Sequence, residues 1–166
     1  MFGAPTNSSV YLSTDFGVSW TASSSPGLQW RSLATGKSGK YVAAVAWKGG
    51  VYISQNFGVS WSATANSTSA DLQWQAITSS YDGKYLAAVA YSTGIFISSN
   101  YGITWSMSLA DADFWISIAS DSAGQYLVAA AYNSYLYTSS DYGYSWTVVN
   151  TDRKAWQSVT SDYQVF

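Results

Sequence analysis

Three residue types that enzymes and metalloproteins use most are absent from this 166-residue chain. It has no histidine, no cysteine and no glutamate, so all nine of its acidic residues are aspartates. Without His or Cys, neither a Ser-His or Cys-His nucleophile pair nor an ordinary zinc site can be built. Without Cys there is no disulfide, so redox arguments do not assign a compartment. The composition therefore predicts no catalytic residues, no metal and no cofactor.

Charge and long apolar runs are also scarce. Charged residues make up 10% of the chain, against about 25% in an average soluble domain. The seven basic residues are spread along the sequence and form no basic stripe, which argues against nucleic-acid binding. No apolar run approaches the roughly 20 residues of a membrane-spanning helix, so we expect no membrane insertion.

Two features bear on localisation. The residues after Met1 (FGAPTNSS) lack the basic and apolar regions of a signal peptide. The sequons at Asn7 and Asn66 would accept glycans in a eukaryotic secretory setting, although chance matches are common in a serine-rich chain. We expect an extracellular or cell-surface location.

The chain repeats one eight-residue phrase four times. The copies read STDFGVSW at 13–20, SQNFGVSW at 54–61, SSNYGITW at 98–105 and SSDYGYSW at 139–146, which spaces their tryptophans by 41, 44 and 41 residues. A second tryptophan series at 30, 74, 115 and 156 keeps the same period. Two independent markers with one period indicate a structural repeat.

Each repeat reads as four short strands. In the unit that starts near Trp30, we expect strands at 29–35, 41–47, 51–54 and 59–63. The second strand is continuously apolar, which is typical of a strand buried on both faces. It is rich in alanine, which leaves room for neighbouring strands near a common axis. Four strands in about 42 residues predict an all-β propeller with four blade equivalents, in which residues 1–166 form a single domain.

The repeated phrase resembles the Asp-box, or bacterial neuraminidase repeat, of sialidases, sortilin-type receptors and photosystem assembly factors. The resemblance implies a propeller in which Asp or Asn accepts N–H bonds across a turn, Gly takes a positive φ and Trp packs between blades. Asn56 and Asn100 depart from the consensus Asp. The implied structural residues are Asp15, Gly17, Trp20, Asn56, Gly58, Trp61, Asn100, Gly102, Trp105, Asp141, Gly143 and Trp146.

Sialidase chemistry does not carry over. Such enzymes use an arginine triad and a Tyr–Glu pair, whereas this chain has two Arg and no Glu. A glycosidase that uses two carboxylates remains a formal alternative, with Asp71, Asp111 and Asp113 as candidates. Solvated turn aspartates explain these residues more simply, and we predict that the protein is not an enzyme.

One predicted blade is divided between the two ends of the sequence. After Trp156 the chain supplies a first strand and half of a second, and the residues from Met1 read as the other half of that second strand and a third strand. Three arrangements fit: closure within one chain, an eight-bladed ring of two chains, and a head-to-tail filament. The chain could also be a piece of a longer propeller. The candidate self-association residues are Met1, Phe2, Gly3, Gln164, Val165 and Phe166.

Two functions compete at this point. The first is a non-catalytic binding or scaffold module whose partner is itself or another protein. The alternative is a carbohydrate-binding propeller with one aromatic site per blade, because aromatic residues reach 17% and sugars bind on aromatic rings. The candidate ligand-binding residues are Trp30, Trp74, Trp115, Trp156, Trp47, Tyr91 and Tyr132.

Overall fold

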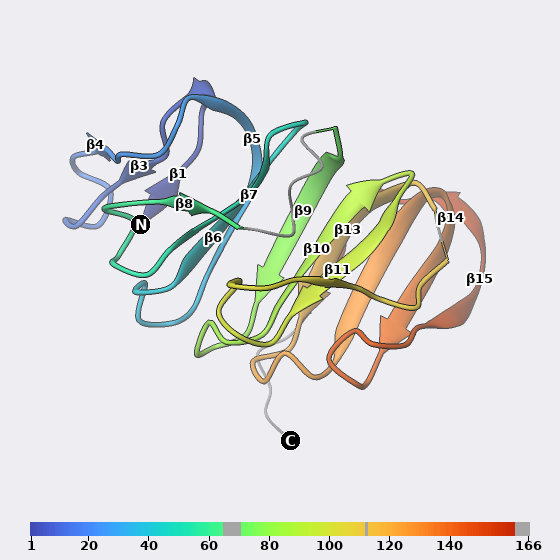
Figure 1. Cartoon of the computed structure of the whole chain (residues 1–166). Helices are drawn as coiled ribbons and strands as arrows, with labels where there is room; N and C mark the ends of the chain where they lie inside the picture. The colour runs from blue at the N-terminus through green and yellow to red at the C-terminus, as the bar shows by residue number, and fades with distance from the viewer. Residues whose placement is uncertain (65–70, 112, 162–166) are drawn as a thin grey trace.

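The computed structural model describes residues 1–64, 71–111 and 113–161, and these form only strands and turns (Figure 1). The described residues contain no helix able to cross a membrane. The strands make four antiparallel sheets of three to five strands. The predicted all-β fold with blade-like sheets is confirmed, and we number the sheets blade 1 to blade 4 in chain order.

The blades have the following strands. Blade 1 contains β1 (Phe2–Gly3), β3 (Tyr11–Leu12) and β4 (Thr21–Ala22). Blade 2 contains β5 (Leu28–Thr35), β6 (Val42–Ala46), β7 (Gly50–Ser54) and β8 (Ser62–Ala63), and β2 (Thr6–Ser8) joins it beside β5. Blade 3 contains β9 (Gln73–Ser79), β10 (Leu86–Tyr91), β11 (Gly94–Ser98) and β12 (Ser106–Met107). Blade 4 contains β13 (Trp115–Ser120), β14 (Leu127–Ser139) and β15 (Thr147–Ala155).

Hairpin turns after the second strands keep the repeat in register. Lys48, Ser92 and Asn133 occupy the same place in successive repeats and all have positive φ, between 51° and 59°, the conformation that tight hairpins require. In blade 4 this turn lies inside β14, whose first half pairs with β13 and whose second half pairs with β15. The fourth strand is shorter than predicted, because Val59 still donates its N–H to the Asn56 carbonyl within the preceding turn.

The hydrophobic core consists of three interfaces between successive blades. Between blades 2 and 3, for example, Val45, Trp74 and Ala88 pack in one cluster. The alanines of β6 and β10 are buried on both faces, so they let neighbouring blades approach as expected. β9 contacts both β5 and β13 across the blade boundaries, which puts the first strands on the inner side of the arrangement.

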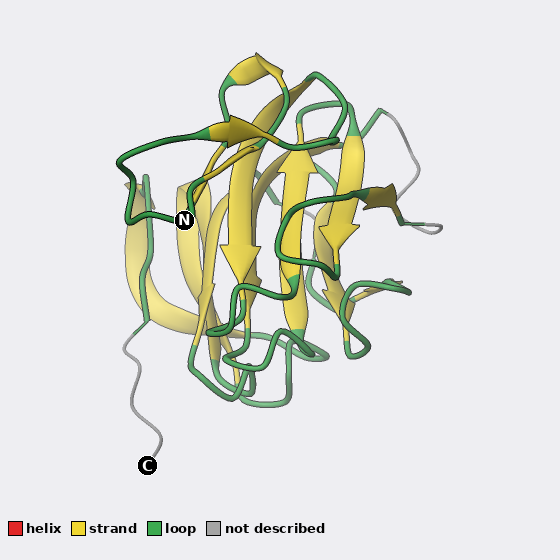
Figure 2. Cartoon of the chain, turned by 90° about the vertical axis from the view of Figure 1, so that its left-hand side faces the viewer, coloured by secondary structure: helices red, strands yellow, loops and turns green. Residues whose placement is uncertain are grey.

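The four blades follow one another in an open arc. Blade 1 and blade 4 lie at opposite ends of the molecule (Figure 1). Figure 2 looks onto the blade 1 end, where the N-terminus lies in front of the other sheets. Closure of a four-bladed ring within one chain, one of the three arrangements considered, is therefore not the arrangement in this structure.

Candidate functional site

The polar side chains of the repeated motif close its own turn. In the first copy, Ser13 Oγ accepts the Gly17 N–H at 2.7 Å and Asp15 Oδ1 accepts the Ser19 N–H at 2.9 Å. Asn100 makes the equivalent bond to the Thr104 N–H at 3.0 Å and adds one from its Nδ2 to Thr104 Oγ1 at 2.8 Å. Asn therefore accepts the same backbone hydrogen bond as Asp, and these hydrogen bonds stabilise the turn of the motif.

Hydrogen bonds also favour the charged form of the motif aspartates. Bonds from the Ser19 hydroxyl and backbone, and then from Ser13, lower the pKa of the partly exposed Asp15 from 3.8 to about 2. For Asp141, burial opposes ionisation, but the bonds from Ser145 and Ser139 outweigh it and lower the pKa. Both carboxylates are ionised at neutral pH.

These pKa shifts predict a loss of stability in acid. Because the folded-state pKa lies below the unfolded value, the stabilisation is present above about pH 4 and is lost as the pH falls toward 2. We expect the double variant Asp15→Asn, Asp141→Asn to lose less stability over this range, since Asn occupies the same motif position at 56 and 100. Urea unfolding midpoints from pH 5 to pH 2 measure the effect. Identical pH dependence in the two proteins would contradict this account.

The candidate ligand-binding tryptophans lie mostly in the core. Trp30, Trp74 and Trp115 are 5%, 0% and 0% exposed, so a sugar could not reach their ring faces. Trp156 is half-buried and donates its Nε1–H to the Ser134 carbonyl at 3.1 Å. A regular spacing marks equivalent positions but does not show which neighbours cover them.

The second candidate series is more open. The guanidinium of Arg31 lies 4.7 Å from the ring centre of Trp47, and Tyr91 stacks on Phe114 at 5.0 Å. Tyr132 is 39% exposed. These three rings lie at the hairpins that follow the second strands. Trp47 and Tyr91 each have a side chain packed against the ring.

The three candidate aspartates of the glycosidase alternative, Asp71, Asp111 and Asp113, differ in their surroundings. Asp113 Oδ2 accepts hydrogen bonds from Ser134 Oγ at 2.6 Å and Tyr137 Oη at 3.0 Å, which ties the link before β13 to β14. Asp71 and Asp111 are exposed. Among the described residues, no group of three acidic, His or Cys side chains is placed to hold a metal ion.

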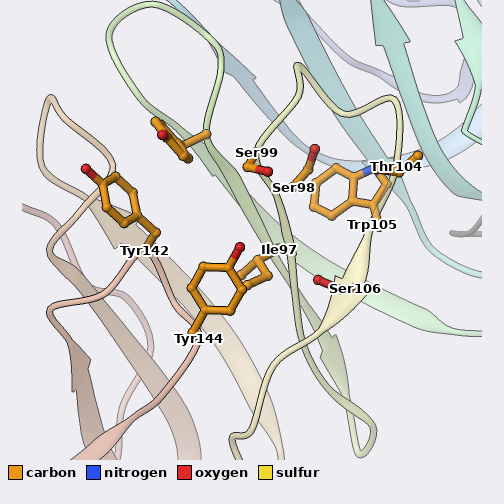
Figure 3. Close-up of a pocket in the computed structure, with 9 residues that line it drawn as sticks. Ile97, Ser98, Ser99, Thr104, Trp105, Ser106, Tyr142 and Tyr144 are labelled. Atoms are coloured by element: carbon orange, nitrogen blue, oxygen red, sulfur yellow. The ribbon is translucent and has the colours of Figure 1, made fainter.

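A small pocket lies between the motif turns of blades 3 and 4 (Figure 3). Its volume is about 100 Å³. Tyr142 and Tyr144 face Ser99, Thr104 and Trp105 across it. The lining is completed by Tyr85, Ile97, Ser98 and Ser106. These residues carry hydroxyls and aromatic rings but no charge, a combination suited to a neutral polar group.

The pocket was not predicted, although its aromatic residues recur once per blade. One tyrosine precedes the second strand, and another aromatic residue precedes the motif glycine. Tyr85 stacks on Tyr142 of the next blade at 4.4 Å, and Tyr41 stacks on Tyr101 in the same way at 4.3 Å. Because both aromatic positions recur from repeat to repeat, their spacing could have indicated that a ring of one blade pairs with a ring of the next.

An open groove lies at the blade 1 end, beside β1 and β5. It has a volume of about 590 Å³. Its lining residues are Met1, Phe2, Trp20, Leu33, Ala34, Thr35, Gly36, Lys37, Ser38, Gly39 and Val42. Blades 2 and 3 have a first strand at the equivalent place, where β9 lies against β5. In blade 1 the described sheet has only β1, β3 and β4, so the groove has the position of a first strand.

The segment 154–161 begins beside β14 of blade 4 as β5 begins beside β2. Lys154 pairs with Ser134 as Leu28 pairs with Ser8. Trp156 Nε1 donates to the Ser134 carbonyl, and Trp30 Nε1 donates to the Ser8 carbonyl at 2.9 Å.

The inner contact of this segment is repeated as well. The Val159 N–H bonds Ser117 Oγ at 3.1 Å, just as the Ile77 N–H of blade 3 bonds Ser32 Oγ of blade 2 at 3.3 Å. The segment therefore holds the place of the first strand of a further blade.

The predicted self-association residues are placed only in part. Phe2 and Gly3 form β1 and pair with Leu12 and Tyr11, and Met1 exchanges backbone bonds with Ser13. Gln164, Val165 and Phe166 lie outside the described residues. Sequence reasoning overlooked Val159 and Thr160, which the period counted from Trp156 could have identified.

Comparison with solved structures supports the fold. An ancestral GH74 enzyme matches 93% of this chain with a TM-score of 0.69 and 16% identity, and the GH74 xyloglucanase from Xanthomonas campestris matches 91% with a TM-score of 0.72 and 16% identity. YCF48 from Cyanidioschyzon merolae matches 73% of this chain with a TM-score of 0.61 and 12% identity. The match covers 39% of the YCF48 chain.

These likenesses are partial. The chain spans about a quarter of each GH74 structure, 26% and 23% respectively. YCF48 has also been solved bound to a D1 peptide. No protein-family model and no curated protein matches the sequence. At such low identity the matches establish a β-propeller fold and nothing finer.

Proposed function

We propose that this chain is a non-catalytic β-propeller module that self-associates by strand addition. Residues 156–161 of one copy become the first strand of blade 1 in another copy. The observation that carries the proposal is the fit between two ends of one arc. One end has a groove where a first strand belongs. At the other end, residues 156–161 hold the place of a first strand, and no further strand follows them among the described residues.

The repeat specifies the register of the added strand. In blade 3, Ile77 pairs with Ala88 and Thr78 with Ala87. The equivalent pairs are Val159 with Gly3 and Thr160 with Phe2, on the free edge of β1. Because the Val159 N–H points to Ser117, the alternation of a strand directs the Thr160 N–H toward the partner's β1. Thr160 is exposed in the single chain.

A proline at Thr160 tests strand addition. Thr160→Pro removes the N–H that would bond β1 and puts a ring at the paired edge, which we expect to weaken self-association at least tenfold. Thr160→Ala keeps the N–H and should associate like the wild type. Sedimentation velocity over a concentration series measures both, and circular dichroism checks the fold. Equal association of the two variants would refute the proposal.

A binding role without catalysis agrees with the composition and the site. The chain lacks His, Cys and Glu, and Asp113 is engaged by Ser134 and Tyr137. The GH74 enzymes it matches are about four times as long, and YCF48 is a propeller with a bound peptide. These observations favour a module that binds a protein partner through its sheet edges and blade surfaces.

A carbohydrate-binding module is the second candidate, and the pocket of Figure 3 favours it. Tyr144 is 53% exposed and lies beside serine and threonine hydroxyls, a combination that suits a sugar. Its small volume would admit one substituent of a sugar ring rather than a whole ring.

A glycan array followed by titration of any hit tests this candidate. We expect Tyr144→Ala to weaken binding of a hit at least tenfold. Phe57→Ala should not, because Phe57 is exposed in the motif turn of blade 2, outside the pocket. An array without hits, or a hit unaffected by Tyr144→Ala, would count against the pocket.

A further inference from the structure

We infer that self-association produces a closed ring of two chains with eight blades, sealed at each seam by Tyr126 of one copy stacked on Phe16 of the other. The inference rests on the proposed strand addition and adds the number of chains and the residues of the seam. It comes from a side-chain contact that recurs at the blade boundaries within the chain.

The recurring contact is an aromatic stack. Tyr41 of blade 2 stacks on Tyr101 of blade 3, and Tyr85 of blade 3 stacks on Tyr142 of blade 4, with ring centres 4.3 and 4.4 Å apart and ring planes within 32°. The next member of the first series is Tyr126 of blade 4, which is 57% exposed. The member of the second series in blade 1 is Phe16, which is 92% exposed. Among the described residues, these two rings at the ends of the arc therefore lack the partners that their equivalents have inside it.

The motif tryptophans also indicate that, in the part of the chain that the structure describes, the blade 1 end lacks a neighbouring blade. Trp105 is 6% exposed because it packs into the interface with the preceding blade. Trp20 occupies the equivalent position in blade 1 and is 44% exposed. Its ring lines the open groove together with Phe2. Docking the blade 4 end of another copy would cover Trp20, Phe16 and the free edge of β1 with one surface.

The blade count favours two chains. Propellers close with about four to eight blades, and the four blades of one chain form an open arc (Figure 1). Two chains bring eight blades, whereas three would bring twelve, beyond the usual range. A two-chain ring also forms both seams in one association, since the second seam closes at a high effective concentration. Each addition to a filament forms only one.

Charge substitutions at the seam test the inference. Phe16→Lys and Tyr126→Glu each remove both stacks of the ring. A stack contributes roughly threefold to tenfold in affinity, so each variant should raise the dissociation constant about tenfold to a hundredfold. The double variant places Lys opposite Glu at both seams and should recover much of the affinity. Leu109→Lys is the matched control and should not change the dissociation constant. Leu109 is 83% exposed and its N–H bonds the Tyr144 carbonyl, which places it at the boundary of blades 3 and 4.

Sedimentation equilibrium gives the number of chains. The wild type should reach twice 17.9 kDa and no more as its concentration rises. Larger species that keep growing with concentration would overturn the ring and leave strand addition standing. A dimer sensitive to Thr160→Pro but indifferent to both charge variants would overturn the seam alone. A monomer at all concentrations would refute the ring and the proposed function together.

Discussion

Replacement of Trp74 by alanine should destabilise the fold by about 3–5 kcal/mol, since truncation of a fully buried Trp both loses apolar burial and leaves a cavity. Trp74 is 0% exposed, lies in the cluster between blades 2 and 3, and its ring centre is 5.0 Å from that of Phe96. A domain of this size is stable by about 5–15 kcal/mol, so the variant should unfold at a much lower urea concentration.

Phenylalanine at the same position is the matched control. The indole Nε1 of Trp74 is buried and has no hydrogen-bond partner among the described residues, so Trp74→Phe loses no hydrogen bond. We expect it to destabilise by about 1–2 kcal/mol through its smaller ring. Urea unfolding of both variants, followed by circular dichroism, gives the two values. Equal costs, or a cost below about 1 kcal/mol for alanine, would mean that Trp74 does not pack the interface as described.

Alanine at Gly102 should destabilise the fold by about 2–5 kcal/mol. Gly102 has φ of 79°, and an added Cβ would lie 2.6 Å from Ile53 Cγ2 and 3.0 Å from Leu86 Cδ1. The left-handed backbone costs about 1–2 kcal/mol for a residue with a Cβ, and overpacking adds about 1–3 kcal/mol. The motif turn of blade 3 lies against blade 2 at this point, so its glycine serves blade packing as well as the turn.

Gly94→Ala is the control, because the added Cβ would overlap a side chain that can move. A Cβ there would lie 2.7 Å from Met107 Cε, the end of a flexible side chain that is 53% exposed. Met107 can move away, so Gly94→Ala should change stability by less than about 1 kcal/mol. Thermal unfolding of the two variants compares them directly. If Gly94→Ala were the more harmful change, the packing of the motif turn would be misassigned.

The fold could be predicted because its signals are local. Each motif turn is closed by residues within four positions of one another, as Asp15 and Ser19 are, so the motif identified its turn without the rest of the chain. The continuous apolar run of β6 likewise predicted a strand buried on both faces. The period of about 42 residues then arranged the strands as blades.

The candidate site depends on contacts between blades, and the sequence does not contain these directly. Trp30 and Trp74 belong to a series as regular as a set of ligand sites, yet the neighbouring blade covers them. Tyr85 and Tyr142 are far apart in sequence and meet only because blade 4 lies beside blade 3. The exposure of Phe16 and Tyr126 likewise follows from which blade comes next.

A disulfide between copies tests the central claim most directly. The chain has no cysteine, so Gly3→Cys, Val159→Cys introduces the only pair. These residues are expected to face each other as a non-hydrogen-bonded pair, whose Cα separation of about 4.5 Å suits a disulfide. Under mild oxidation, a non-reducing gel should show a covalent dimer, and Gly3→Cys alone should show no comparable product. A ladder of larger species, an internally linked monomer, or no cross-link would contradict the two-chain ring.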